Sequence, residues 1–277
     1  SGLLEKKINL SSISNFLSLG YSPSDESNFR NIRQLKPGTR LEIKNSILEK
    51  QWWKLPSYPE SNKLYDLRKS INEVKDIFQK AVKKRLYSDV PMGIYLSGGI
   101  DSSLILSAIA KEGFPENFKS YSLGFEEKDF DESKDAESFA SFFNLDHENI
   151  LMTSEDFRRI FKDVVYKSDN LLANPASFGN YLLSEKASKN VKSIFHGGGG
   201  DELFFGYQTY RADYFSKFIP KIPTFFQKKM INLASFLPET DRRIGFKYKL
   251  VKFIESVNFS AEERHYLWRT IFTEKEK

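Results

Sequence analysis

The sequence predicts an α/β protein built on a parallel sheet with helices on both faces. Through most of the chain, strand-like apolar runs alternate with segments of helical periodicity, which is typical of this class. Two of the strand-like runs end in glycine-rich turns, at residues 97–99 and 197–200, and a helix follows each turn. Ligands of such sheets bind at the carboxyl ends of the strands, where these turns are expected to lie.

The first part of the chain has a different pattern. Residues up to about Pro56 hold few helical repeats, and Asn28–Lys50 is expected to form short strands. Turns are expected at Lys36–Thr39 and near Asn45. Pro56–Ser61, with two prolines and two serines, is a candidate linker. A short β-rich region is therefore expected to precede the α/β domain.

The elements of the α/β domain follow in order from their apolar spacing. The predicted strands cover 94–96, 119–125, 147–151 and 191–195, and the predicted helices cover 64–86, 100–110, 132–143, 155–167, 180–189 and much of 240–277. Aromatic residues recur at helical spacing in Phe204–Phe226. This spacing favours a helix packed on the sheet over a base-stacking surface, which would need a continuous basic track.

Composition limits the classes of function. The chain has 277 residues, no cysteine and three histidines, so disulfides, thiol nucleophiles and Cys-ligated zinc are excluded. The net charge is +5, with basic and acidic residues interspersed, which gives no support to a nucleic-acid partner. The start of the sequence, SGLLEKK, has no signal-peptide pattern, and no apolar run is long enough to span a bilayer. No membrane partner and a cytoplasmic location are therefore expected.

The segment GIYLSGGIDSS, residues 93–103, has the chemistry of an anion site. Glycines allow a close approach of the backbone, and the start of a helix offers free N–H groups and a favourable dipole. The hydroxyls of Ser97, Ser102 and Ser103 can donate to phosphate oxygens. Asp101 would repel a bare phosphate, so its presence indicates a divalent cation between the carboxylate and a pyrophosphate group.

The segment HGGGGDELFFGYQTY, residues 196–210, is the second glycine motif. Four consecutive glycines are unsuited to a regular helix or strand and favour close approach to a ligand. Asp201 is the expected second carboxylate for the cation, whereas Glu202 is explained by its place in the first turn of a helix.

The stretch KRLYSDVPMGIYLSGGIDSSL, residues 84–104, resembles the synthetase domain of glutamine-hydrolysing asparagine synthetases, and SGGIDSS resembles the pyrophosphate loop of ATP pyrophosphatases. This resemblance implies the adenine nucleotide alpha-hydrolase-like fold, ATP and Mg²⁺ as cofactors, and a small carboxylate and ammonia as reactants. It implies that Asp101 and Asp201 are catalytic and hold the metal. The nucleotide contacts that it implies are Leu96, Ser97, Gly98, Gly99, Asp101, Ser102, Ser103, Leu123, His196 and Gly197.

The resemblance also implies a domain plan. Residues 1–56 look like the remnant of a glutaminase-like domain, without that domain's amino-terminal cysteine. Residues 57–277 look like the synthetase domain, incomplete at its C-terminal end, where the family's E-x-R-x-P-F-L-D segment and its catalytic lysine are not found. A separate glutaminase domain or subunit and a homodimer are both open as partners.

The chain departs from the family pattern at three places that bear on the substrate. His196 replaces a serine, and Gly198 replaces a glutamate that in the family lies near the acyl centre and assists amine attack. In the stretch that matches the acyl-acceptor pocket, Asn170 and Asn174 replace acidic residues. Gly198 has no group that could transfer a proton.

Three hypotheses remain open. The first is amide formation through an acyl-adenylate, with aspartate, ATP and ammonia or glutamine giving asparagine, AMP and pyrophosphate. The second keeps this chemistry but activates another carboxylate, such as a sugar acid or a β-lactam precursor. The third is an ATP-binding scaffold without turnover.

Overall fold

The computed structural model describes residues 4–23, 25–56, 66–127, 131–238, 245–272 and 276–277. The chain forms two compact units. Unit 1 consists of Ser1–Ser70, Val165–Asn174 and Arg269–Lys277, and unit 2 of Ile71–Val164 and Pro175–Trp268. The candidate linker at Pro56–Ser61 falls, apart from Pro56, outside the described residues.

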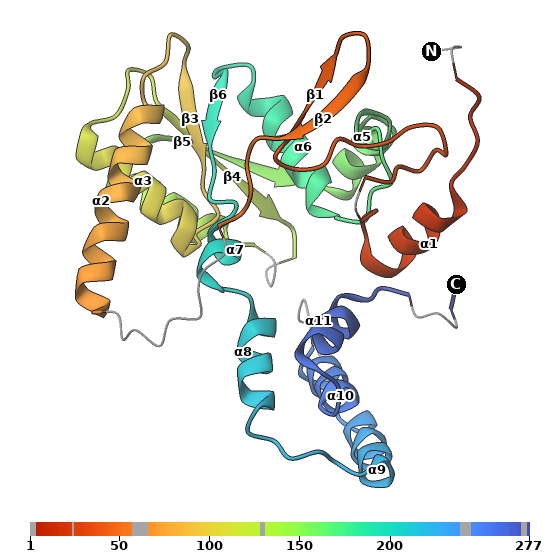
Figure 1. The fold of residues 1–277 in the computed structure, drawn as a ribbon. Helices are drawn as coiled ribbons and strands as arrows, with labels where there is room; N and C mark the ends of the chain where they lie inside the picture. Colours follow the sequence, from red (N-terminus) through yellow and green to blue (C-terminus); the bar gives the residue numbers. More distant parts are fainter. Residues whose placement is uncertain (1–3, 24, 57–65, 128–130, 239–244, 273–275) are drawn as a thin grey trace. The chain divides into compact units, whose positions relative to one another are not determined.

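Unit 2 is built on a four-stranded sheet in the order β5-β4-β3-β6, in which every neighbouring pair is parallel (Figure 1). The strands are β3 (Met92–Tyr95), β4 (Lys119–Phe125), β5 (Asp146–Met152) and β6 (Ser193–Phe195). The chain winds outward from β3 through β4 to β5 and then returns to place β6 on the other side of β3. The winding therefore reverses between β3 and β6, and the crevice at such a reversal is where ligands of open α/β sheets bind.

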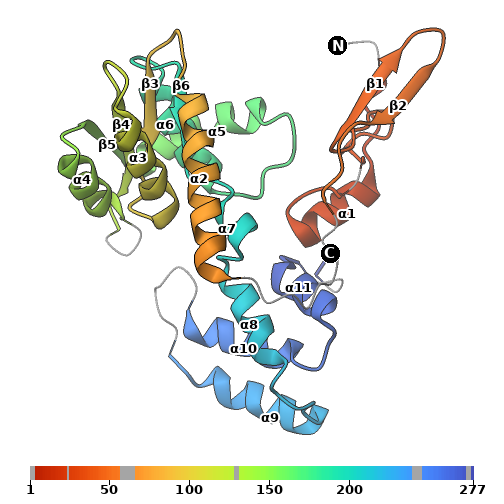
Figure 2. The ribbon, with the colours of Figure 1, turned by 60° about the vertical axis from the view of Figure 1, so that its left-hand side comes forward.

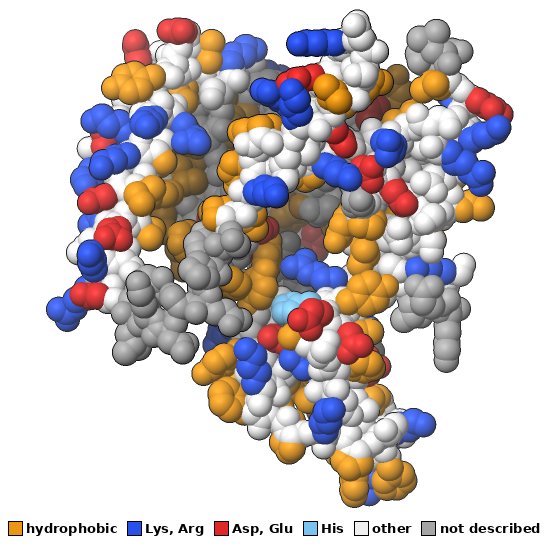
Figure 3. Space-filling view, viewed as in Figure 1, with side chains coloured by type: hydrophobic (Ala, Val, Ile, Leu, Met, Phe, Trp, Pro, Cys, Tyr) orange, Lys and Arg blue, Asp and Glu red, His pale blue; other side chains and the backbone are white. Residues whose placement is uncertain are grey.

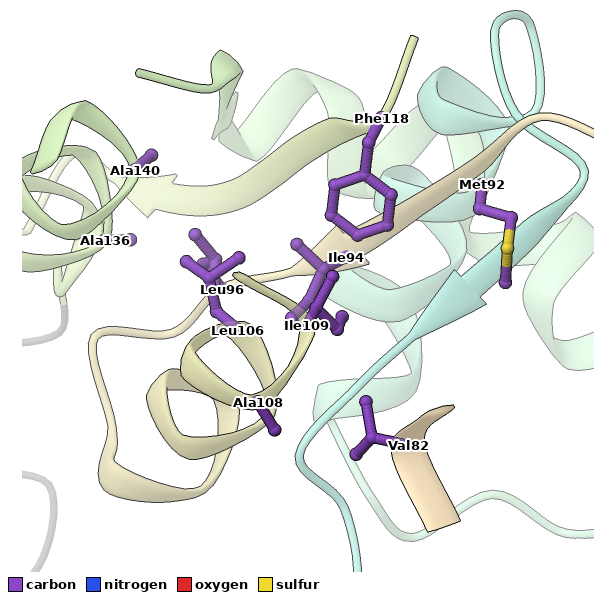
Figure 4. Packing of buried hydrophobic residues seen from close by; sticks show 10 residues of the cluster. All are labelled: Val82, Met92, Ile94, Leu96, Leu106, Ala108, Ile109, Phe118, Ala136 and Ala140. Carbon is purple, nitrogen blue, oxygen red and sulfur yellow. The ribbon is translucent and has the colours of Figure 1, made fainter. Parts of the chain in front are cut away.

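One face of the sheet is covered by α2 (Leu67–Arg85), α3 (Ile100–Glu112) and α4 (Ser133–Phe142). Their buried side chains form one apolar cluster with Met92 and Ile94 of β3 (Figure 4). Small residues of α4, Ala136 and Ala140, allow this helix to lie close to the sheet. The cluster fixes α3, and therefore the turn that precedes it.

The opposite face is covered by α6 (Ala176–Ala187), which contacts β4 and β5 (Figure 2). The hydroxyls of Tyr95 in β3 and Ser184 in α6 lie 3.1 Å apart. A Cβ atom added at Gly179 of α6 would lie only 2.5 Å from the side chain of Leu123 in β4. The helix α5 (Ser154–Lys167) packs on α6 through aromatic contacts. The predicted parallel sheet with helices on both faces is therefore confirmed.

The predicted bounds differ from the observed ones mostly by a few residues. The helix predicted to start at Asn180 begins four positions earlier, at Ala176, directly after Pro175. Proline favours the start of a helix because it has no N–H to leave unsatisfied. The strand predicted at 191–195 shortens to three residues in β6.

The prediction for Phe204–Phe226 is wrong. The segment is divided among α7 (Gly200–Phe204), α8 (Gln208–Ser216) and the start of α9 (Thr224–Ser235), and Phe205 has a left-handed conformation with φ of 55°. Instead of packing on the sheet, Phe204 remains 68% exposed, as does Phe205. The aromatic residues do recur at helical spacing. However, α7 ends at Phe204 and Phe205 is left-handed, so the segment does not form one continuous helix.

The helices after α8 pack on one another. Side-chain Nε2 of Gln227 in α9 donates to the carbonyl of Ile254 in α10 (Phe246–Ser256) at 2.6 Å. Arg264 of α11 (Ala261–Arg269) forms an ion pair of 2.7 Å with Asp213 of α8. Hydrophobic side chains also gather on the outer surface of α9 (Figure 3). In the part of the chain that the structure describes, no helix combines the length and apolarity needed to cross a bilayer.

Unit 1 contains α1 (Leu10–Leu19) and an antiparallel hairpin of β1 (Thr39–Ile43) and β2 (Ile47–Gln51). The hairpin agrees with the strands predicted in Asn28–Lys50. The helix α1 was not predicted, although Asn9 caps its first turn through the Ser12 N–H and Gly20 ends it in a left-handed conformation. Serine residues interrupt the apolar spacing of α1, so its helical pattern is weak. The assignment of residues 1–56 to a glutaminase-like domain stays a prediction.

Candidate functional site

The candidate site is formed by two loops that follow β3 and β6 at the reversal of the winding. The first loop runs from Ser97 to Gly99 and leads into α3. The second runs from His196 to Gly199 and leads into α7. Because β3 and β6 are adjacent and parallel, with Ile94 paired to Phe195, both loops leave the same edge of the sheet.

The first loop is held by hydrogen bonds between its own serines and backbone. The Ser97 hydroxyl accepts the N–H of Gly99 at 3.3 Å and lies 3.3 Å from the Ser102 hydroxyl. The Ser102 hydroxyl donates to the Gly99 carbonyl at 3.2 Å and accepts the N–H of Ser97 at 3.3 Å. Ser102 is 3% exposed. Its hydroxyl therefore shapes the loop from inside, whereas Ser97 is exposed and Ser103 half-buried.

The start of α3 fits an anion. The N-cap residue is Gly99, which has no side chain to accept from the first N–H groups of the helix. These N–H groups have no partner within the helix and carry the positive end of its dipole. The loop conformation depends on Gly98, whose φ is +70°. An uncapped helix start and a glycine turn are both compatible with an anion cradle, whose assignment stays a prediction.

The second loop lies directly against the start of α3. A Cβ atom at Gly197 would lie 2.8 Å from the Ser102 nitrogen and 3.0 Å from the Asp101 Cβ. A Cβ atom at Gly200 would lie 2.3 Å from Oδ2 of Asp101. A larger side chain at Gly197 would press on the backbone at the start of α3, and one at Gly200 would displace the Asp101 carboxylate. The glycines of the second motif therefore serve the close approach of the two loops.

The structure brings the Asp101 carboxylate beside the backbone of Gly200, the residue before Asp201. Asp101 is half-buried and Asp201 is exposed. The Asp201 carboxylate turns toward the Gly206 backbone, where an added Cβ atom would overlap its Oδ1. The two carboxylates predicted to share a cation thus come from loops that meet. Among the described residues, no three acidic, histidine or cysteine side chains form a metal-binding group.

A pair of carboxylates suits Mg²⁺, which takes few protein ligands and completes its shell with water and substrate phosphates. The structure supports the fit through three features: the uncapped start of α3, the absence of side chains at Gly197 and Gly200, and the neighbouring carboxylate of Asp101. These residues could hold a metal-bridged phosphate group. Their assignment as ligands stays a prediction.

The predicted nucleotide contacts away from the loops lie along the sheet. Leu96 is buried in the apolar cluster, and its N–H donates to the Tyr121 carbonyl at 2.8 Å. Leu123 is half-buried and packs on Gly179 of α6. The Leu96 side chain is therefore part of the core, so a contact of this residue with a nucleotide would involve its backbone.

Sequence reasoning missed the neighbours of the first loop on α4. A Cβ atom at Gly98 would lie 2.7 Å from the Cβ of Asp135, in the first turn of α4. Gly98 and Asp135 also line a hollow of about 680 Å³ between α3 and α4, together with Ile100, Ser103, Leu104, Ser107, Ser138, Phe139 and Phe142. Parallel winding was the available signal, because it places the β4–α4 connection beside the β3–α3 turn.

His147 is the second residue of β5, near the amino ends of the parallel strands, whereas both loops follow the carboxyl ends. Its Nδ1 is 3.0 Å from the Ser120 hydroxyl, and its Nε2 is 3.0 Å from the Ser122 hydroxyl. Burial lowers the pKa of His147, while Glu137 and Asp146 act in the opposite direction. These hydrogen bonds join β4 to β5, so His147 has a structural role in the sheet. Asn170, by contrast, belongs to unit 1, where its Oδ1 accepts from the side chain of Asn28.

Comparisons with a family model and with curated relatives agree on one family. The family model described as asparagine synthase matches residues 73–276. A putative glutamine-hydrolysing asparagine synthetase 2 of Methanocaldococcus jannaschii is 32% identical over 224 residues, which cover 80% of this chain and 43% of that protein. Asparagine synthetase 1 of Bacillus subtilis is 31% identical over 238 residues, covering 84% and 36%. The amidase chyE of Penicillium rubens is 31% identical over 245 residues, covering 81% and 35%. The chain spans less than half the length of these relatives.

Proposed function

The chain belongs to the asparagine synthase family, and from this premise we propose that it forms an amide through an acyl-adenylate. The observation that carries the proposal is the meeting of the two glycine loops, with the Asp101 carboxylate against Gly200 at the start of α7. In the proposed complex, the pyrophosphate part of ATP occupies the loop at Ser97–Ser103, and Asp101 and Asp201 hold Mg²⁺.

The reaction has two steps. An oxygen of the substrate carboxylate attacks the α-phosphorus of ATP, and the bond from that phosphorus to the bridging oxygen breaks and releases pyrophosphate. Ammonia then attacks the acyl carbon, a C–N bond forms, the bond to AMP breaks, and the nitrogen loses a proton. The contribution of this chain is positioning and charge: the start of α3 and the two carboxylates act on the phosphates, where the leaving group develops negative charge.

The substrate carboxylate is the open part of the proposal. Aspartate is the first candidate, because two of the relatives are named asparagine synthetases. Another acid is the second candidate. It is favoured by the glycine at position 198 and by the relative of similar identity that is named an amidase.

The test measures pyrophosphate release by the full chain with ATP, Mg²⁺, ammonia and a panel of carboxylic acids. Release that depends on aspartate supports the first candidate, and release that depends on another acid supports the second. Calorimetric titration with Mg²⁺-ATP is the companion measurement. Mg²⁺-dependent binding without release for any acid would contradict turnover and leave an ATP-binding scaffold, whereas no binding at all would contradict the proposal entirely.

A further inference from the structure

The helix α9 leaves its bulkiest side chains exposed. Its buried and half-buried residues, Gln227, Ile231 and Ala234, recur at i, i+4 and i+7 and therefore share one side of the helix. Nε2 of Gln227 donates to the carbonyls of Ile254 and Glu255 in α10, so this side faces α10. Four large apolar residues of the helix and its C-terminal end are each between 57% and 85% exposed: Phe225, Phe226, Leu233 and Phe236.

The exposed side of α9 is also basic. Lys229 lies in the same row as Phe225 and Leu233, because the three residues recur at i, i+4 and i+8. Figure 3 shows basic side chains beside the hydrophobic ones over α9. Residues 214–238 contain no acidic residue and four lysines, all exposed: Lys217, Lys221, Lys228 and Lys229. We define the basic apolar face of α9 as Phe225, Phe226, Lys228, Lys229, Leu233 and Phe236.

This combination of side chains matches the surface of a bilayer that contains anionic lipids. Phenylalanine and leucine side chains enter the boundary between head groups and acyl chains when a helix lies in the plane of the membrane. Lysines bury their stems along the same apolar surface and keep the ammonium groups at the level of the phosphates. Each lysine near an anionic surface strengthens binding about fivefold.

Other partners fit the face less well. In a two-fold contact between copies of the chain the same patch would meet itself, so the lysines of one copy would approach those of the other. A single-stranded nucleic acid binds in a positively charged groove, where arginine is favoured for phosphate contacts. The basic apolar face is instead the outer side of a helix, and residues 214–238 contain no arginine.

We propose that the basic apolar face of α9 binds the surface of a membrane that contains anionic phospholipids. The inference goes beyond the proposed function and does not depend on it, because none of these residues belongs to the two glycine loops. The sequence prediction of no membrane partner was drawn partly from the lack of a long apolar run. A helix that lies in the plane of the membrane surface does not need such a run.

The experiment is cosedimentation of the full chain with lipid vesicles. The chain is expected to sediment with vesicles of phosphatidylcholine and phosphatidylserine in equal parts and to stay in solution with vesicles of phosphatidylcholine alone. Binding should be lost in about 1 M NaCl, where the screening length falls to about 3 Å.

Two lysines test the charge of the face. Lys228→Gln combined with Lys229→Gln should weaken binding to the anionic vesicles about 25-fold, at about fivefold for each lysine. The matched control is Lys75→Gln combined with Lys80→Gln, which removes two exposed lysines from α2. Since α2 lies outside the face, this control should bind as the unmodified chain does.

Two aromatic residues test the apolar part. Phe225→Ala combined with Phe226→Ala should weaken vesicle binding by about tenfold or more, because less apolar surface enters the membrane. The melting temperature should not change, since both side chains are exposed. Phe142→Ala is the matched control, because Phe142 is an exposed phenylalanine of α4. It should leave vesicle binding unchanged.

Three results of the vesicle assay would overturn the inference: equal binding to both kinds of vesicle, unchanged binding in the variants of the face, or an equal loss in the α2 control. Two further measurements identify another occupant. Sedimentation velocity would reveal a dimer that Phe225→Ala with Phe226→Ala makes monomeric. Titration with a single-stranded oligonucleotide would reveal binding that requires Lys228 and Lys229. Either result, without binding to anionic vesicles, would also overturn the inference.

Discussion

The two glycine loops meet at one edge of the sheet, but they are stabilised in different ways. The first loop is tied by four hydrogen bonds among Ser97, Gly99 and Ser102, and its helix α3 packs in the apolar core. The second loop leads to the short helix α7, which has no buried residue, and its main internal contact is the ring of His196 on Gly198. The first loop is thus preformed by packing, whereas the second depends on the absence of side chains. We expect substitutions in the first loop to affect the fold and those in the second to affect the site.

The largest effect is expected where both loops contribute, at Asp101. Asp101→Asn removes a negative charge from the proposed metal site while keeping the shape of the side chain. Loss of a direct ligand should exceed the effect of an outer partner, so Mg²⁺-ATP affinity should fall by more than about 100-fold. Calorimetry with and without EDTA measures this change. If EDTA has no effect on ATP binding by the unmodified chain, the metal role of Asp101 is refuted.

The next prediction concerns the closest approach of the loops. Gly200→Ala would place a Cβ atom 2.3 Å from Oδ2 of Asp101, and the carboxylate must then move. A displacement of this order at a catalytic group can reduce the rate by up to about 100-fold. Thermal unfolding should show little loss of stability, because the added Cβ meets the end of a flexible side chain and not the backbone. A large fall in the melting temperature would show that the second loop, too, is part of the core.

The next variants restore the family residues, serine at 196 and glutamate at 198, in the second loop. Gly198→Glu alone should reduce amide formation about tenfold or more, since the new side chain overlaps the His196 ring and misplaces the loop. His196→Ser with Gly198→Glu removes the overlap and should recover activity relative to the single variant. The readout is ammonia-dependent product formation at fixed ATP. Equal activities of the single and double variants would show that the two positions are independent.

In the first loop, Gly98→Ala tests packing. The residue has a φ of +70°, and its Cβ atom would lie 2.7 Å from the Cβ of Asp135. The left-handed conformation alone costs about 1–2 kcal/mol for a residue other than glycine, so the melting temperature should fall. Gly199→Ala bears the cost of the left-handed conformation without the contact, because Gly199 is left-handed, with φ of 100°, and nothing lies within 4 Å of an added Cβ there. A greater loss in Gly98→Ala measures the contact with α4.

The smallest effect is expected at His147, outside both loops. Its pKa is lowered in the folded state by burial, so the unfolded chain binds the proton more tightly. Stability should therefore be complete above the unfolded pKa of 6.5 and fall as the pH decreases toward the folded value. The expected change in melting temperature is a few degrees, and His147→Gln should reduce it. Nucleotide affinity at pH 7.5 should not change in this variant.

Most of the sheet and both loops could be predicted from the sequence, because their signals are local. Apolar runs followed by glycine identify β3, β6 and their turns, and alternation with helices requires parallel strands. Three features were not predicted. The capping of α1 by Asn9 and Gly20 outweighed its weak apolar pattern, and the left-handed Phe205 interrupted an otherwise regular aromatic spacing. The contact of Asp135 with Gly98 has no local signal and follows only from the parallel winding of the sheet.

The candidate site was predicted in its residue types and only partly in their roles. Ser102 illustrates the difference, since three hydroxyls were expected to face phosphate and this one is buried in the loop. The relation of His196 to Gly198 was equally hidden. Both residues were recognised as departures from the family, but the direction of an imidazole ring is set by a backbone N–H that no spacing pattern encodes.

The position of β6 has a consequence for the newly made protein. As the ribosome extends the chain, β3, β4 and β5 emerge in order and can pair at once, with α3 and α4 packed on them. The strand β6 comes last and completes the edge with only three residues. A nascent chain that stops before Ser193 would already carry the cradle of α3 but would lack its glycine-rich neighbour. On the proposed function, the nucleotide site made by both loops could therefore form only after β6 has joined the sheet.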